Sequence, residues 1–258
     1  MIARVEIPAV VLRTVDVGDS GRVVTLLTRE QGKLAAFARG ARASRRRFAG
    51  ALEPFTLLAA GLSGGEGEAL ARLESAAIVR SFHAIRGELP RIACAACAAE
   101  LSGALLRDLE PHPALFDRLV AYLERLDAAP ATPAGLRVFE LGALADAGYR
   151  PRLDGCARCG ARAPEEGEGG PLLFSPGDGG VLCAACAPSG SAGALRLSAG
   201  ALALLRRLQA LGDAGGEPVA PGAWREARDV LERFIERLAG RRLASRRFLD
   251  EVGPWLGG

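Results

Sequence analysis

Six cysteines form three CxxC pairs, and two of these pairs have the spacing of a metal site. Cys156 and Cys159 in "CARCG" and Cys183 and Cys186 in "VLCAAC" lie outside helical patterns, with 23 residues between Cys159 and Cys183. Two thiolates on one tight turn can both point at one ion, and two such turns complete a tetrahedral Zn²⁺ site. Because four cysteine ligands leave no open position for substrate, we expect this zinc to be structural.

The third pair, Cys94 and Cys97 in "IACAACAAE", has a different context. Cysteine alternates there with alanine on a predicted helix, where both are small packing residues. We therefore expect a close helix–helix contact. A redox CxxC is the alternative, but no strand precedes the pair as the thioredoxin pattern requires.

The positive charge of the chain is concentrated near its N-terminus. The overall net charge is only +3, yet the stretch from Gln31 to Leu52 holds six basic residues and no acidic one. Such a local excess is typical of a surface that binds a polyanion. The residues expected to contact nucleic acid are Lys33, Arg39, Arg42, Arg45, Arg46 and Arg47.

The run "GARASRRRFAG" contains four of these arginines, and strands are predicted on both sides of it. It is therefore interpreted as a charged loop on a small barrel rather than a disordered arm. Phe37 and Phe48 could stack on bases or belong to the core. A loop that is merely solvated is the alternative to a DNA contact.

A second basic cluster lies in "RLAGRRLASRRF" near the C-terminus and has no acidic residue. Part of it closes a helical pattern, where positive charge is favourable at the helix C-terminus. The cluster is also a candidate site for nucleic acid or an acidic peptide. Its members are Arg237, Arg241, Arg242, Arg246 and Arg247.

The first eighty residues have the pattern of five short strands, over 8–17, 22–29, 33–39, 53–61 and 69–82. Five strands joined by short turns predict a closed barrel of the OB type. The last of these segments is rich in Leu and Ala, so a helix is the alternative there. One face of an OB barrel and its loops is the usual nucleic-acid surface.

The rest of the chain is predicted to be helical. Pro90 suits a first helical turn, and Leu101, Leu105 and Leu109 recur at helical spacing as a buried face. Further helices are expected over 114–126, 134–147, 198–211 and 222–239 and around Phe248. The predicted fold class is α+β, with an OB-fold domain over 1–80 and a helical domain over 81–258 that carries a zinc ribbon at about 152–190.

Several function classes have no support in the sequence. There is no GxxxxGK[ST], GxSxG or HExxH motif, and the two histidines are too few for most acid–base sites, so we expect no enzyme. No apolar run reaches the roughly 18–20 residues of a membrane span, and the N-terminus lacks the pattern of a signal peptide. The cytosol is therefore the expected compartment.

The stretch "VVLRTVDVGDSGRVVTLLTREQGKLAAFARGARASRRRFAGALEPF" resembles the bacterial recombination-repair mediator family RecO. The "CARCG…CAAC" ribbon and the closing "FIERLAGRRLASRRFLDEV" are similar to the same family. The resemblance covers essentially the whole chain.

The resemblance implies a function as well as a fold. Proteins of this family bind single- and double-stranded DNA, anneal complementary strands, and act with RecR and the single-stranded-DNA-binding protein SSB to load RecA. It therefore implies DNA, RecR and the SSB C-terminal tail as partners, RecA as an indirect one, and a cytoplasmic, nucleoid-associated protein. Two other classes remain open: a zinc-containing thiol redox protein that uses Cys94 and Cys97, and an RNA-binding zinc-ribbon protein.

Overall fold

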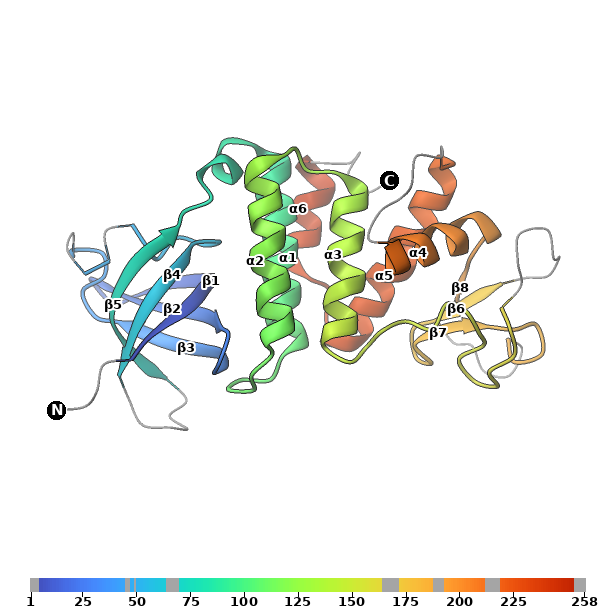
Figure 1. The fold of residues 1–258 in the computed structure, drawn as a ribbon, viewed down its shortest axis with the longest axis horizontal. Helices are drawn as coiled ribbons and strands as arrows, with labels where there is room; N and C mark the ends of the chain where they lie inside the picture. The colour runs from blue at the N-terminus through green and yellow to red at the C-terminus, as the bar shows by residue number, and fades with distance from the viewer. Residues whose placement is uncertain are drawn as a thin grey trace. The chain divides into compact units, whose positions relative to one another are not determined.

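The computed structural model describes residues 5–44, 47–48, 50–63, 70–163, 172–187, 193–211 and 219–252. Arg45 and Arg46 of the predicted DNA-binding loop lie outside these residues. The chain divides into two compact units, Met1–Pro130 and Ala131–Gly258. Figure 1 shows a β-barrel and helices in the first unit, and helices with a small sheet in the second.

The first unit begins with a closed barrel of five strands in the order β1-β2-β3-β5-β4. The five strands are β1 (Val5–Val17), β2 (Gly21–Thr28), β3 (Gly32–Ala38), β4 (Leu57–Ser63) and β5 (Ala71–Arg80). All neighbours are antiparallel except β3 and β5, which are parallel and pair only at Ala36↔Ala71 and Phe37↔Arg72. This confirms the predicted five-stranded barrel.

Alternating side chains explain the barrel. In β3, Leu34, Ala36 and Ala38 point into the core while the intervening residues face outward. The strands close around an apolar interior to which β2 contributes Val24 and Leu26. The Leu- and Ala-rich fifth segment is a strand, because pairing with β4 along most of its length outweighs its helix propensity.

Three helical segments complete the first unit: the 3₁₀ helix η1 (His83–Gly87), α1 (Leu89–Leu105) and α2 (Pro113–Ala128). Pro90 lies in the first turn of α1, as predicted. The prediction that Leu109 belongs to a buried helical face was wrong. Since α1 ends at Leu105, Leu109 is outside the helix, has a φ of 60° and is 44% exposed.

The second unit contains four helices among its described residues: α3 (Pro133–Asp146), α4 (Ala199–Leu211), α5 (Pro221–Ala239) and α6 (Ala244–Val252). A three-stranded antiparallel sheet in the order β7-β6-β8 lies between α3 and α4 in the chain. Its strands are β6 (Leu173–Ser175), β7 (Gly180–Leu182) and β8 (Leu195–Arg196). In the described part of the chain, no helix combines the length and apolar character needed to span a membrane.

Candidate metal centre and nucleic-acid interface

The four cysteines of the predicted metal site come together in the second unit, on two similar turns. In the first turn, the N–H of Gly160 donates to the carbonyl of Cys156 (2.9 Å), and Gly160 has a φ of 76°, which favours glycine. In the second, which follows β7, the N–H groups of Cys186 and Ala187 donate to the carbonyl of Cys183 (3.0 and 2.9 Å). Each CxxC pair therefore forms a compact knuckle.

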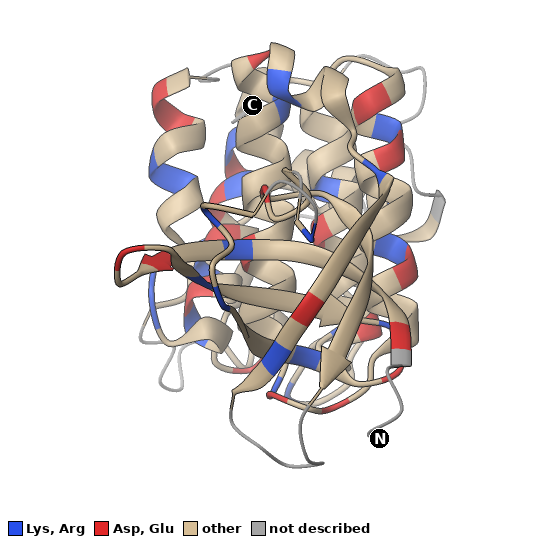
Figure 2. Cartoon of the chain, turned by 90° about the vertical axis from the view of Figure 1, so that its left-hand side faces the viewer, with Lys and Arg blue, Asp and Glu red and all other residues tan. Residues whose placement is uncertain are grey.

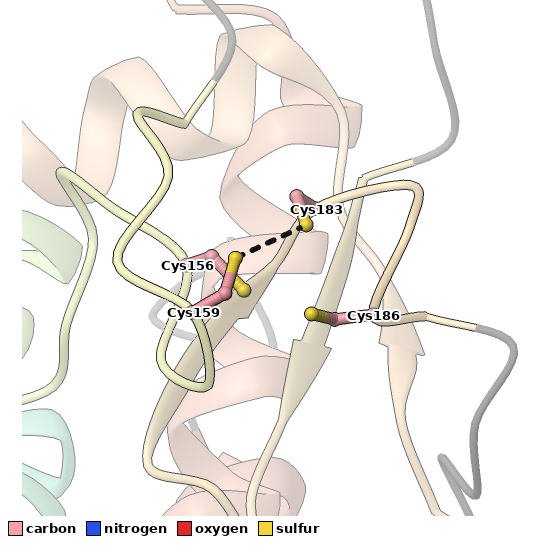
Figure 3. A group of neighbouring side chains, drawn as sticks. All are labelled: Cys156, Cys159, Cys183 and Cys186. Carbon is pink, nitrogen blue, oxygen red and sulfur yellow. Dashed lines mark hydrogen bonds between the residues drawn. The ribbon is translucent and has the colours of Figure 1, made fainter.

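The thiols of both knuckles point toward one centre (Figure 3). Their Sγ atoms all lie within 4.8 Å of one another, and those of Cys159 and Cys183 are 3.6 Å apart. Four sulfurs arranged tetrahedrally about one Zn²⁺, each roughly 2.3 Å from the ion, are about 3.8 Å apart. The cluster therefore fits a single metal ion of this size.

The thiols of Cys156 and Cys186 differ in acidity. Burial raises the pKa of the Cys156 thiol, but backbone N–H groups of Cys159, Cys183 and Arg158 donate to its sulfur and lower the pKa to about 6. At Cys186, hydrogen bonds with the sulfurs of Cys159 and Cys183 raise the pKa to about 12. Four adjacent thiolates repel one another, so a bound cation is needed before all four ionise.

Arg158 ties the two knuckles together. It lies inside the first CxxC turn, and its Nη1 donates to the carbonyl of Cys186 in the second (3.1 Å). Its Nε and Nη2 donate to the two carboxylate oxygens of Asp178, each at 2.9 Å. This forked ion pair lowers the pKa of Asp178, helped by the hydroxyl of Ser175.

In the barrel, Lys33 lies apart from the arginines with which it was grouped. Its Nζ donates to the carbonyls of Gly103 and Leu106 (both 2.8 Å), at the end of α1, and lies 3.1 Å from the carboxylate of Asp108. Lys33 and Arg39 lie at either end of β3, so about 20 Å of strand separates them. Lys33 therefore joins the barrel to the end of α1.

The described arginines of the loop after β3 are exposed. The Nη2 of Arg47 donates to the carbonyl of Arg39 (2.8 Å), and its guanidinium lies 5.1 Å from the ring centre of Phe48. Phe48 is a core residue, 2% exposed. Arg42 is held by the carbonyl of Asp19 (3.4 Å) and lies 3.8 Å from the carboxylate of Asp16. Figure 2 shows Lys and Arg interspersed with Asp and Glu in the barrel.

Arg72 is a further exposed arginine of this region that sequence reasoning missed. It is the direct partner of Phe37 in the β3–β5 pairing, and it lines a pocket with Arg39 and Arg47. A single arginine on a strand 25 residues after the run gives no signal by itself. Only the parallel pairing of β3 with β5 reveals that it belongs with the loop arginines.

The second basic cluster is exposed only in part. Arg237, Arg241, Arg242 and Arg247 are exposed, and Arg242 lies 3.0 Å from the carboxylate of Asp250. Arg246 is 3% exposed and contacts the buried Glu140, so the prediction that it belongs to a surface site was wrong. Its position on α6 turns it toward the helix core.

Cys94 and Cys97 lie inside the first unit, 0% and 2% exposed. Both cysteines lie on α1, beside Tyr122 of α2. The pKa of Tyr122 is raised by burial and by the neighbouring Cys94. The pair therefore occupies a tightly packed helix contact, and its thiols are closed to reagents in the folded protein.

The parallel closure of β3 on β5 makes the barrel an OB-fold, a class of small barrels that binds oligonucleotides or oligosaccharides in many proteins. Here it is joined to a helical unit with a four-cysteine cluster. Residues 1–82 match the family model "Recombination protein O N terminal" and residues 86–247 match "Recombination protein O C terminal". The chain belongs to the recombination protein O (RecO) family of DNA repair proteins.

Curated relatives are similar in sequence to this chain over nearly its whole length. The DNA repair protein RecO of Anaeromyxobacter sp. (strain K) is 60% identical over 98% of this chain and 99% of its own length. That of Myxococcus xanthus is 46% identical over 95% and 96%. That of Geobacter sulfurreducens is 40% identical over 95% and 97%.

Proposed function

We propose that this protein binds single- and double-stranded DNA through its barrel and anneals complementary strands during recombinational repair. The observation that carries the proposal is the group of exposed arginines beside the parallel closure of an OB-fold. The proposed contacts are Arg39, Arg42, Arg45, Arg46 and Arg47, to which we add Arg72. We assign Lys33 to the junction with α1 instead.

Annealing requires no bond to be made or broken by the protein. Two DNA strands repel each other through their phosphates, and a protein that offers positive charge to both lowers this repulsion, so that base pairing can follow. We expect the protein to act in the bacterial cytoplasm and nucleoid. Its expected partners are those of the family, RecR and SSB, with which it would help to load RecA.

The test is DNA affinity across a salt series. We compare the double variant Arg39→Ala/Arg47→Ala with the control Arg29→Ala/Arg80→Ala. Both variants lose two positive charges. The control arginines lie outside the loop and are paired with Asp117 and Glu124. The first variant should bind more weakly, with the log–log salt slope flatter by about 0.7 per lost single-strand phosphate contact. If both variants match the wild type, the loop arginines do not bind DNA.

We further propose that the four-cysteine cluster holds one structural Zn²⁺. When bound, the ion would join the two knuckles and contribute to the folding of the ribbon. Metal analysis of the purified protein should find about one zinc per chain, and Cys159→Ser should lose it. The variant Cys97→Ala, outside the cluster, should retain it. Equal metal content in the two variants would place the ion elsewhere.

The acidic tail of SSB is the proposed ligand of the second unit. A pocket of about 440 Å³ in the second unit is lined by three arginines and two aromatic residues, together with the carboxylate of Asp178, and its excess of positive charge suits an acidic peptide with an apolar residue. Its lining includes Tyr149, Arg150, Arg152, Phe234 and Arg237. Binding of a tail peptide should be lost in Arg152→Glu/Arg237→Glu. If only Arg241→Glu/Arg242→Glu weakens it, the peptide binds the C-terminal cluster instead.

A further inference from the structure

A pocket of about 520 Å³ lies on the barrel beside the place where β3 meets β5. The two strands pair at Phe37↔Arg72, after which β3 ends. The following loop returns to β5 farther along, where the N–H of Ala76 donates to the carbonyl of Arg47 (3.0 Å). The pocket lies between these two attachments, and its volume is in the range of roughly 300–1,000 Å³ typical of small-molecule sites.

The lining of this pocket is strongly basic. Arg39, Arg47 and Arg72 contribute guanidinium groups, against the single carboxylate of Glu74. Arg47 is fixed by its bond to the carbonyl of Arg39 and by its contact with the Phe48 ring. Within the described part of the chain, neither Arg39 nor Arg72 has a carboxylate within ion-pair distance. Two cationic side chains are therefore available to an anion.

The same pocket has one aromatic wall, Phe37. A Cβ at Gly21 would lie 2.7 Å from Cε2 of the Phe37 ring, so the ring rests directly on the bare backbone of β2. This contact holds the ring in place while part of it lines the pocket. Of the two phenylalanines near the arginine run, Phe48 is buried in the core, so only Phe37 can stack on a ligand.

The carboxylate of Glu74 in the lining narrows the class of ligand that the pocket can bind. Glu74 accepts a hydrogen bond from the hydroxyl of Ser63 (2.8 Å) and adds a negative charge to the wall. This disfavours a bare multivalent anion. It suits a ligand that carries phosphate together with N–H donors, and nucleobases supply such donors.

We propose that this pocket takes one unpaired nucleotide, with its base against Phe37 and its phosphates against Arg39, Arg47 and Arg72. Bases in a duplex are already stacked on one another, so only a single strand can place a base on the ring. The inference rests on the proposed DNA binding and adds a preference for single strands. Duplex DNA would contact the arginines alone.

Full-length protein tests this with a single-stranded oligo(dT) and a blunt duplex at one salt concentration. Phe37→Leu keeps an apolar cover over Gly21 but removes the stacking surface. Its affinity for oligo(dT) should fall about 5- to 100-fold, while its affinity for the duplex stays within about twofold of the wild type. Arg72→Ala should weaken both. The control Arg80→Ala lies about 26 Å away along β5, removes the same charge and should weaken neither.

A second variant keeps the test informative if Phe37→Leu unfolds. Phe37→Trp should keep binding oligo(dT), and its added tryptophan emission should be quenched by oligo(dT) but not by the duplex or by inorganic polyphosphate. Quenching by all three, or unchanged oligo(dT) affinity in Phe37→Leu, would overturn the nucleotide pocket while leaving DNA binding intact. A wild-type protein that binds neither DNA would instead refute the proposed function itself.

Discussion

The guanidinium of Arg246 on α6 contacts the carboxylate of Glu140 on α3 inside the second unit, where the two side chains are 4% and 1% exposed. Arg137 lies 2.9 Å from the other oxygen of the same carboxylate, and Glu232 on α5 lies 3.5 Å from Arg246. Two arginines and two glutamates thus compensate one another among three helices. Each charge is acceptable in the interior only because its partners are present.

Removing Glu140 should therefore destabilise the second unit severely. Glu140→Ala leaves Arg137 and Arg246 without their shared carboxylate, and breaking a buried pair in this way typically costs about 3–5 kcal/mol. Urea unfolding followed by tryptophan fluorescence, to which Trp224 on α5 contributes, measures the change in the free energy of unfolding. The control Arg242→Ala removes an exposed pair with Asp250 and should cost at most about 1 kcal/mol. Similar losses in the two variants would contradict the network.

Glu232 should make stability depend on pH. Burial raises its pKa above the ordinary 4.5, although Arg137 opposes the shift. As pH rises from 4.5 to the folded-state pKa, the unfolded chain has released a proton that the folded protein still holds, so the free energy of unfolding falls. Relative to Glu232→Gln, the wild type should lose stability across this interval and then level off. Unfolding curves for both proteins between pH 4 and 8 check this; parallel profiles would show that Glu232 does not titrate abnormally.

Arg158 should affect retention of the proposed zinc without being a ligand. Arg158→Ala removes the bond to the carbonyl of Cys186 and the pair with Asp178, so the two knuckles lose their brace. Losing an outer partner of a metal site typically weakens metal affinity about 10- to 100-fold. Competition with a chromophoric chelator measures zinc affinity directly. Arg196→Ala, an exposed arginine on β8, serves as the control, and an equal effect there would exclude a specific role for Arg158.

Local patterns predicted much of this molecule. The helices and barrel strands were placed to within a few residues, because alternation in β3 and helical spacing in α5 depend only on neighbours in the chain. The cysteine cluster was predictable for the same reason, since each knuckle is encoded within five residues. The strands β6, β7 and β8 were not anticipated, because two or three residues are too few to form a pattern.

Pairings between distant segments were not predictable. Arg72 joins the arginine loop only through β3–β5 pairing, and Arg246 is buried only because Glu140 lies opposite. Both residues belong to sequence contexts that indicate ordinary exposed charge. Whether an arginine faces solvent or a buried carboxylate depends on the fold, and the charge run alone cannot distinguish the two.

Lys33 provides a direct test of this distinction. Its ammonium donates to two carbonyls at the end of α1, so Lys33→Met, which keeps the apolar stem, should lower the free energy of unfolding by about 1–3 kcal/mol. Its DNA affinity and salt slope should remain those of the wild type, because the ammonium is already engaged within the unit. Chemical unfolding and DNA titration of the same preparation provide both values. Arg39→Ala should show the opposite pattern, with unchanged stability and weaker binding. Weaker DNA binding by Lys33→Met at unchanged stability would show instead that Lys33 contacts DNA.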